Sequence, residues 1–474
     1  MVTSIPSSFF LYAASSAANI ASFICGIAFG WTSPEIPQLK NVTTTPLDSI
    51  ITASEEGWIG AFLPLAAAVG PIGAGILADS IGRKWTILVG NVPFLLAFIL
   101  NVVANSVYFF YISRFLCGLG VGIIFTVLPM YIGEISDDGS RGVLGSLMQL
   151  FCVVGLLFSY ALGPFLSIKI FNAILIIPPT MFIILFSVFI PDSPYFLLQK
   201  RRMSDAVQAL MKFRGRELSF AKKEAEAINS QLEDDLKSKG TFQLIFKSQG
   251  LRKGLTISLT LIGAQQLSGI TVVLFYAQSI FADAGVPIAP EVCTIIVGIV
   301  QVLASAVTPL LVDRCGKRLL LMISGLGMAI AHSILAFFFY LKNVQDADLS
   351  NLGWLPILSI VVFIITYCLG FGPLPWAVMG EIFPGNVKSI ASSATASFCW
   401  ILGFFLTNYF GAVTKMMGQS ASFGVFGICC VMAAAYVFKF VPETTGKSVS
   451  EIQCLLDGSI KKSLELIYSK VESV

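Results

Sequence analysis

A cluster of neutral polar residues interrupts the apolar run from 255 to 281. Gln265, Gln266 and Thr271 lie near its middle, and Gly269 separates the glutamines from the threonine. The run exceeds the roughly 20 residues that a helix needs to cross a bilayer. Carboxamides and hydroxyls at that depth need hydrogen-bond partners, because hydrocarbon offers none. Such groups either join helices or line a path for a polar solute, and the remaining sequence must decide between these roles.

The composition is that of a polytopic membrane protein. Of the 474 residues, 56% are hydrophobic and only 12% are charged, whereas roughly 25% of residues are charged in a soluble chain. The net charge of +3 gives no argument for nucleic acid as a partner. The sequence contains no nucleotide-binding loop, metal-ligand cluster or nucleophile–base arrangement. We therefore expect neither an enzyme nor a bound cofactor or metal.

Twelve apolar runs predict twelve transmembrane helices. They cover residues 9–31, 57–78, 85–104, 108–132, 142–164, 169–190, 254–281, 292–312, 319–341, 354–380, 389–413 and 421–441. These runs are too long and too uniformly apolar for the alternating pattern of a membrane barrel, so we expect an all-helical membrane protein. The expected organisation has two six-helix halves, a small helical cytosolic insert and a cytosolic tail, at 1–190, 254–441, 191–253 and 442–474 respectively.

Basic residues predict the orientation in the bilayer. If both termini are cytosolic, Arg114 lies inside a span and the outer loops hold only four lysines: Lys40, Lys169, Lys342 and Lys415. All other Lys and Arg residues are then cytosolic, as the positive-inside rule requires. The single N-glycosylation sequon begins at Asn41, in the first outer loop. We expect an integral protein of the plasma membrane that functions as a monomer.

Three short motifs recur in the two halves in the same order, which indicates a duplication. Each follows the equivalent span: Asp79-x-x-Gly82-Arg83-Lys84 and Asp313-x-x-Gly316-Lys317-Arg318; Glu134-Ile135 with Arg141 and Glu381-Ile382 with Lys388; Pro191-Asp192-Ser193 and Pro442-Glu443-Thr444. Two equivalent halves suggest a substrate site at their interface and rocking of one half against the other.

All of these charged motifs lie at the expected cytosolic mouth. A network of such acids and bases could bias two conformations by a few kcal/mol. Basic residues alone would set the topology and the matched acids would not be needed, so we favour a gating role. The expected gating residues are Asp79, Arg83, Lys84, Glu134, Arg141, Asp313, Arg318, Glu381, Lys388 and Glu443.

The chain resembles the sugar porter family of the major facilitator superfamily over nearly its whole length. The resemblance is most specific at Pro191-Asp192-Ser193-Pro194, at the stretch from Gln265 to Thr271 and at Gly372-Pro373-Leu374-Pro375-Trp376. The residues from Gly370 to Trp376 are similar to the insect branch of trehalose and hexose facilitators. The resemblance therefore implies transport of a small neutral sugar through the lipid bilayer.

The resemblance also implies a central sugar site shared by both halves. Its residues would be Gln149, Gln265, Gln266, Thr271, Trp376 and Trp400, with Phe29, Tyr276 and Gln301 in second rank. The chemistry is suitable, because carboxamides both donate and accept hydrogen bonds and indoles cover the apolar face of a pyranose. Each residue also has a structural alternative: Gln149 could join helices, and Trp400 could face lipid or a neighbouring helix. His332 is expected to be a packing residue, and Arg114 needs a polar partner that the sequence does not identify.

Several positions depart from the family pattern. Thr271 stands where many hexose carriers have asparagine, and Cys399 and Gly403 replace asparagines that are common in the eleventh span. The C-terminal half therefore offers fewer hydrogen-bond donors and more space, which would suit a disaccharide. The sequence leaves trehalose, glucose and fructose open.

Acidic residues are expected to be absent from the interior of every span. Proton-coupled relatives carry a first-span aspartate where this chain has Thr32. A proton relay at mid-depth normally needs a titratable group, so we predict facilitated diffusion. The alternatives are a proton-coupled sugar symporter and a sensor that binds sugar without moving it.

Overall fold

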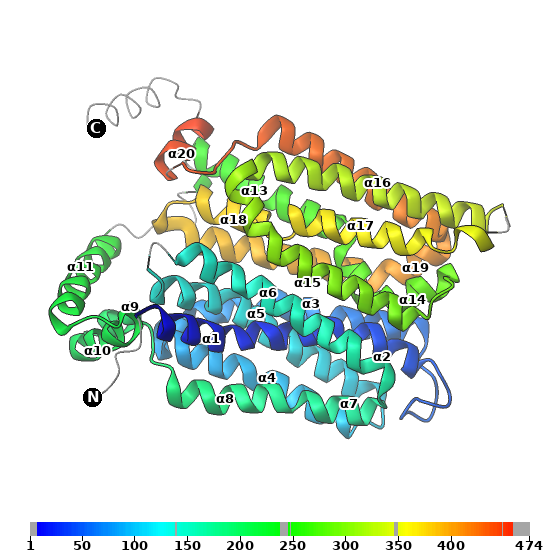
Figure 1. Cartoon of the computed structure of the whole chain (residues 1–474), viewed down its shortest axis with the longest axis horizontal. Helices are drawn as coiled ribbons and strands as arrows, with labels where there is room; N and C mark the ends of the chain where they lie inside the picture. The colour runs from blue at the N-terminus through cyan, green and yellow to red at the C-terminus, as the bar shows by residue number, and fades with distance from the viewer. Residues whose placement is uncertain are drawn as a thin grey trace.

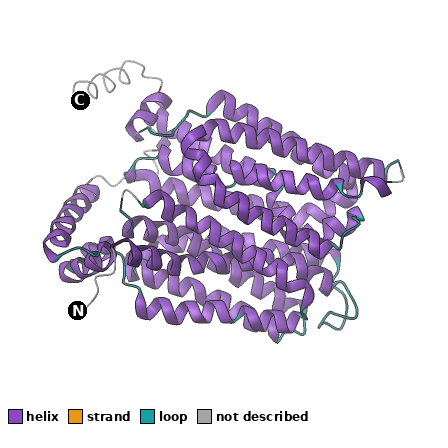
Figure 2. Ribbon diagram, in the orientation of Figure 1, coloured by secondary structure: helices purple, strands orange, loops and turns teal. Residues whose placement is uncertain are grey.

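The computed structural model describes residues 7–137, 140–237, 245–246, 248–345, 349–447 and 449–457. Within these ranges it does not describe the side chains at 7, 8, 141, 231, 233–237, 313, 350, 385, 386, 389 and 450. Within these ranges the chain forms helices and no strand (Figure 1, Figure 2). The prediction of an all-helical fold is therefore confirmed.

The N-terminal half consists of six spans, two of which are made of two helices. Its elements are α1 (Ser7–Gly30), α2 (Thr32–Leu39), α3 (Ala53–Ile81), α4 (Arg83–Val102), α5 (Val107–Ile135), α6 (Arg141–Leu162), η1 (Gly163–Phe165), α7 (Ile168–Leu175) and α8 (Ile177–Phe189). A capping box fixes the start of α3, since Thr52 and Glu55 bond to each other's backbone N–H. Gly82 separates α3 from α4 at φ 100°, a conformation that favours glycine.

The linker and the C-terminal half are also helical, and a glycine again separates two successive spans. The linker contains α9 (Pro194–Gln199), α10 (Met203–Arg214) and α11 (Leu218–Lys237). The remaining elements are α13 (Gln249–Leu267), α14 (Ile270–Ala284), α15 (Pro290–Cys315), α16 (Lys317–Asn343), η2 (Ser350–Leu352), α17 (Leu355–Leu369), α18 (Leu374–Ile382), α19 (Gly385–Phe440) and α20 (Val449–Asp457). Gly316 separates α15 from α16 at φ 76°, just as Gly82 separates α3 from α4.

The element α19 is two antiparallel spans. A straight helix of its 56 residues would be about 84 Å long, far more than the roughly 30 Å of a bilayer core. Gly418 has the non-helical angles φ 84° and ψ 159°, and the rings of Phe410 and Phe426 stack at 6.4 Å across that break. The described helices include 11 candidate spans when α19 is taken as one. With α19 divided at Gly418, they form twelve.

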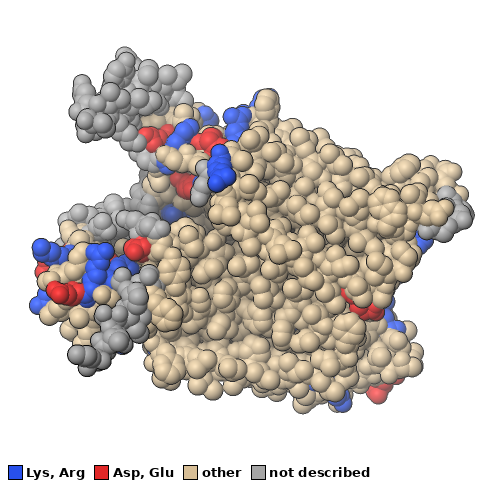
Figure 3. Space-filling view, in the orientation of Figure 1, with Lys and Arg blue, Asp and Glu red and all other residues tan. Residues whose placement is uncertain are grey.

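Charged side chains lie at the two ends of the helix bundle (Figure 3). One end, here called the linker end, carries α9, α10, α11 and α20, together with the start of α1 (Figure 1). The opposite end, here called the far end, carries the loop between α2 and α3. The surface between them is uncharged over the face drawn in Figure 3, as a bilayer requires.

The two halves touch towards the far end and diverge towards the linker end. Along α3, contacts with the C-terminal half occur at Gly57, Gly60 and Pro64, and the Ala68 carbonyl accepts from Ser397 Oγ at 2.9 Å. Further along the same face of α3, two turns after Ala68, a Cβ placed on Gly75 would have open space around it. The interface between the halves is therefore accessible from the linker end in this conformation.

Candidate functional site

The seventh span breaks at Ser268 and Gly269, and Gln265 lies directly before the break. Gly269 adopts φ 80°, which ends α13 and lets α14 start in a new direction. The buried Gln265 amide Nε2 donates to the Phe371 and Gly372 carbonyls at 2.7 Å each. Those carbonyls are freed because the tenth span also breaks, between α17 and α18. Gln265 thus joins the two broken spans, since freed backbone groups within a membrane need partners.

Gln266 and Thr271 form a second pair across the same break. Thr271 Oγ1 donates to Gln266 Oε1 at 2.6 Å, and Gln266 Nε2 contacts Cys399 Sγ at 3.1 Å. Gln266 Oε1 also lies 3.6 Å from a Cβ placed on Gly403. Gln266 and Thr271 are predicted sugar contacts, and Cys399 and Gly403 are the departures noted in the eleventh span. The structure brings all four together on α13, α14 and α19. The two glutamines are bonded within the C-terminal half in this conformation.

Aromatic rings from both halves meet beside this polar pair. Phe29 of α1 stacks on Trp400 of α19, with ring centroids 5.9 Å apart. Phe125 of α5 meets the edge of Trp400 at 6.2 Å, and Phe275 of α14 stacks on Phe29 at 6.5 Å. The sequence singled out Phe29 and Trp400 but missed Phe125, which has no signal of its own in an apolar run. The cluster lies where the two halves meet.

Tyr276 lies at a kink in α14 and fastens it to the neighbouring spans. Its backbone is non-helical at φ −119° and ψ 18°, and its hydroxyl donates to the Thr407 carbonyl at 3.2 Å. The same oxygen packs against Gly60 of the other half. These contacts place Tyr276 in the closed region towards the far end.

Gln149, Gln301 and Trp376 lie around the interface and share no side-chain partner among the described residues. Gln149 is half-buried on α6, on the face that also carries Tyr160. The Tyr160 hydroxyl donates to the Leu274 carbonyl of the opposite half at 2.6 Å, so this face of α6 points to the interface. Gln301 is buried on α15 and its Oε1 has no hydrogen-bond partner among the described residues. Trp376 is half-buried at the start of α18.

The two residues whose partners the sequence left open are both bonded to backbone. Arg114 Nη1 donates to the Ala28 carbonyl at 2.6 Å and Nε donates to Ile59 at 3.2 Å. His332 is more than a packing residue, because its Nε2 lies 2.7 Å from the Ser268 carbonyl at the break of the seventh span. Both side chains satisfy carbonyls at or near helix breaks.

One expectation about the first span is wrong. The apolar run predicts a span that ends at Trp31, and no acidic residue is expected in the interior of any span. The helix continues through α2 instead, and the candidate span runs from Phe9 to Leu39. Glu35 is 0% exposed there, and neither carboxylate oxygen has a partner among the described residues. The apolar run ends near Trp31, but the helix does not, because Pro34 is within the first turn of α2, where proline is tolerated.

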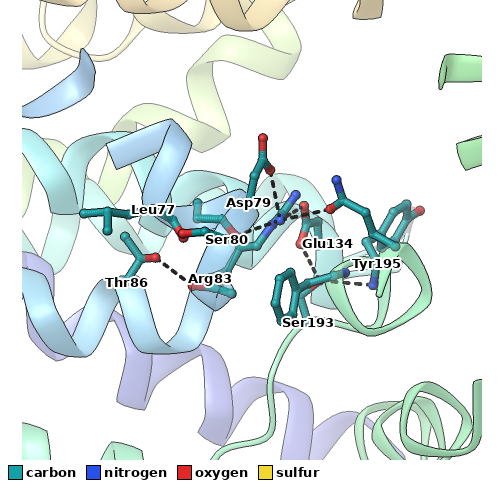
Figure 4. A network of polar contacts seen from close by, with 12 residues as sticks. Leu77, Asp79, Ser80, Arg83, Thr86, Glu134, Ser193 and Tyr195 are labelled. Atoms are coloured by element: carbon teal, nitrogen blue, oxygen red, sulfur yellow. Dashed lines mark hydrogen bonds and ion pairs between the residues drawn. The ribbon is translucent and has the colours of Figure 1, made fainter. Parts of the chain in front are cut away.

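At the linker end, the N-terminal half has a closed polar network (Figure 4). Arg83 at the start of α4 bonds to Glu134 Oε1 at 3.0 Å and to Asp79 Oδ1 at 3.3 Å. Glu134 Oε2 accepts from the Ser193 hydroxyl, which also caps α9. The Lys84 backbone N–H donates to Asp192 at 3.2 Å. The network joins α3, α4, α5 and the start of the linker.

The C-terminal half repeats this arrangement with a different basic residue from the one expected. Lys317, and not Arg318, pairs with Glu381 at 2.5 Å. Arg318 donates instead to the Phe438 carbonyl, while Glu443 accepts the backbone N–H of Lys317 at 3.2 Å and of Arg318 at 3.0 Å. The signal for Lys317 was present, because it occupies the place of Arg83 in the repeated motif.

The equivalent acids Asp192 and Glu443 have opposite electrostatic environments. Burial raises the pKa of Asp192, although bonds from the Ser193 and Lys84 N–H groups act against it. Burial alone would also raise the pKa of Glu443, but hydrogen bonds from Thr445, Arg318 and Lys317 lower it overall. The pKa values of these two acids, which occupy equivalent places in the two copies of the motif, are therefore shifted in opposite directions.

Comparisons with known proteins identify the family. The family described as "Sugar (and other) transporter" matches residues 12–456. The chain belongs to this family. It is 36% identical over 448 residues to the facilitated trehalose transporter Tret1 of Polypedilum vanderplanki, which covers 94% of this chain and 88% of the relative. It is 37% identical over 443 residues to the Tret1-2 homolog of Drosophila sechellia, with 93% and 90% covered. The expected resemblance to insect facilitators is confirmed.

Solved structures give the same fold. The partially occluded inward-open xylose transporter XylE of E. coli matches with a TM-score of 0.78 at 24% identity, covering 93% of this chain and 100% of that chain. The chain is thus an integral membrane protein with the fold of the major facilitator superfamily, as expected from its two six-helix halves.

Proposed function

We propose that this chain moves a neutral sugar, with trehalose as the first candidate, down its concentration gradient. The observation that carries the proposal is the uncharged set of polar and aromatic residues where the halves meet. Gln266 and Thr271 form its polar side, and Phe29 with Trp400 forms its aromatic side. Carboxamides and hydroxyls match sugar hydroxyls, while aromatic faces cover the apolar face of a pyranose. The relatives named as facilitated trehalose transporters support the same assignment.

The transport cycle would alternate the two ends of the interface. In the present conformation α3 meets α19 near Gly57 and Pro64 and leaves Gly75, on the same face, open towards the linker end. Sugar would then be released to, or taken from, the linker end. Rocking of the halves would open the far end and close the linker end. The networks around Glu134 and Glu381 would bias the equilibrium between the two conformations, because they hold the helix ends that must approach one another when the linker end closes.

The proposed orientation in the membrane follows from the distribution of charge. The linker end is proposed to be cytosolic, with both termini there, because the basic linker helices lie at this end. Asn41 is exposed at the far end, and its Oδ1 accepts from Thr43 Oγ1 at 2.8 Å. It is therefore an accessible acceptor for glycosylation at the outer face of the plasma membrane. One chain supplies both halves of the site, so a monomer is sufficient.

A proton-coupled symporter is the second candidate, and Glu35 is the observation that favours it. Both Glu35 oxygens lack a partner among the described residues, and an ionised carboxylate is costly to bury without one, so Glu35 is the candidate carrier of a coupled proton. If opening of the far end exposes Glu35, the cycle would bind and release a proton. The test is uptake by the wild type and by Glu35→Gln at outer pH 5.5 and 7.5. A facilitator gives the same pH dependence in both proteins, whereas coupling through Glu35 is lost in the variant.

Uptake of labelled trehalose and glucose into proteoliposomes tests the main proposal. We expect saturable trehalose flux that unlabelled trehalose competes away. Gln149→Ala should reduce this flux without changing the thermal unfolding temperature, because Gln149 makes no hydrogen bond that the described structure would lose. Glucose flux without trehalose flux would assign the chain to the hexose carriers. Binding of trehalose without any flux would contradict transport and favour a sensor.

A further inference from the structure

A cavity that the sugar pathway does not use lies at the linker end of the N-terminal half. It has a volume of about 570 Å³ and lies between the start of α4, the segment around Asp192 and helices α9 and α10. Its charged lining residues are Lys84, Asp192, Lys200, Arg202, Asp205 and Lys212. Four cationic side chains therefore face two carboxylates.

The carboxylates neutralise the lysines only in part: Asp192 interacts electrostatically with Lys84, whose Nζ also donates to the Ser187 carbonyl at 2.7 Å. Asp205 is paired with Arg202 at 2.6 Å, and Asp192 Oδ1 accepts the backbone N–H groups of Ser193 and Lys84. Lys200 and Lys212 make no ion pair with the residues that the structure describes. Like charges gathered around a hollow repel one another, and a bound anion would remove this repulsion.

The mouth of the cavity is at the level of a bilayer surface. Ile81 and Trp85 line it, and they are 40% and 52% exposed on the outside of the bundle. Val188 and Phe189 at the end of α8 are also exposed. Exposed tryptophan beside apolar residues at the end of a span is typical of the membrane interface. The lysines thus lie where lipid phosphate groups would be.

We propose that this cavity binds the phosphate of an anionic lipid headgroup, held by Lys84, Lys200 and Lys212. Lysine ammonium groups bind phosphate as point charges, and basic pockets of this kind at the cytosolic side of spans bind such headgroups. The headgroup would connect α10 to α4, because Lys212 lies on α10 and Lys84 at the start of α4. The same cavity wall contains Asp192, so the bound lipid would stabilise the adjoining network of Glu134 and Ser193.

Direct titration of the purified full-length protein in detergent tests the proposal. The probes are a short-chain phosphatidylinositol phosphate, a short-chain phosphatidylcholine and inorganic phosphate. We expect the anionic lipid to bind in a salt-dependent manner and the zwitterionic lipid not to bind. The double variant Lys200→Gln, Lys212→Gln should lower the affinity for the anionic lipid by about tenfold or more. A matched control removes two exposed lysines of α11 outside the cavity, Lys222→Gln and Lys223→Gln, and should bind as the wild type does.

The arms of the experiment distinguish the sources of phosphate. Binding of lipid that inorganic phosphate does not displace identifies a lipid site. Displacement by millimolar phosphate, with the same loss in the cavity variant, keeps the phosphate site and makes its ligand soluble. Equal binding by the cavity variant and by the α11 control would overturn the proposal. So would absence of binding in all three titrations, provided that the protein unfolds at its normal temperature.

Discussion

The two halves have their polar side chains hydrogen-bonded in different places, the N-terminal half at the linker end and the C-terminal half at the centre. In the N-terminal half both oxygens of Glu134 are bonded, to Arg83 and to Ser193, and its side chain is 16% exposed. In the C-terminal half Glu381 is 37% exposed and its Oε2 has no partner among the described residues. At the centre of the molecule it is the C-terminal half whose polar side chain is hydrogen-bonded. The Gln265 amide donates to two carbonyls of the C-terminal half, while the Gln149 side chain of the N-terminal half makes no hydrogen bond with the described residues.

This difference shows how a duplicated framework can acquire two roles. The linker supplies Ser193 to the N-terminal network, and the residue at the equivalent place, Thr444, makes no such bond to Glu381. Breaks in the seventh and tenth spans give the C-terminal half carbonyls that Gln265 must satisfy. The N-terminal half is therefore fastened at the linker end, and the C-terminal half is fastened at its centre.

Removal of Glu134 should have the largest effect. Glu134→Ala leaves the buried Arg83 guanidinium with only the exposed Asp79 as an ionic partner. We expect it to lower the free energy of unfolding by about 3–5 kcal/mol. The equivalent Glu381→Ala should cost only about 1 kcal/mol, because that pair is more exposed. Thermal unfolding of both variants in detergent measures the difference, and equal losses would contradict the proposed asymmetry.

Substitutions of Gln265 and of Gln149 should have different effects on stability. Gln265→Leu leaves the Phe371 and Gly372 carbonyls unpaired, at about 1–3 kcal/mol for each group. Its effect on transport should therefore be accompanied by a lower unfolding temperature. Gln149→Ala should lower trehalose flux at unchanged stability. Parallel measurement of uptake and unfolding separates the two cases. A fully stable Gln265→Leu would mean that the tenth span does not depend on this amide.

The linker contribution can be measured through Ser193. Ser193→Ala removes a bond to Glu134 and the cap of α9, which should cost about 1 kcal/mol. In the Glu134→Ala background the same substitution should cost less, because one of its two partners is already absent. Unfolding of the two single variants and the double variant gives the coupling, and strict additivity would show that Ser193 does not act through Glu134.

The smallest expected effect is the response to acid. Because its pKa is lowered on folding, Glu443 contributes stability above its unfolded pKa of about 4.3, and this is lost as the pH falls through the lower folded value. The raised pKa of Asp192 has the opposite effect: the folded state gains relative stability as the pH falls through the raised value. At pH 7 Glu443→Gln should unfold at a lower temperature than the wild type and Asp192→Asn at a higher one, and both differences should shrink as the pH falls to 3.5. Parallel curves would refute the assignment.

The sequence predicted the spans, the duplication and most of the central residues, because hydropathy and repeated motifs are local signals. It could not show which backbone break would face Gln265, since that depends on how α17 and α18 meet α13. It missed the burial of Glu35 because the apolar run ends near Trp31, whereas the helical span continues to Leu39. It chose Arg318 over Lys317 although the repeat aligned Lys317 with Arg83. These errors concern three-dimensional pairing and not composition.

The level at which labelled trehalose stops accumulating tests the central claim most directly. Proteoliposomes containing the protein are loaded with buffer and exposed to trehalose with and without an inward proton gradient. Facilitated transport predicts the same internal and external concentration at the plateau in both cases, reached only when protein is present. A plateau above the external concentration under the proton gradient would contradict facilitated diffusion and identify a coupled carrier, with Glu35 as the first residue to test.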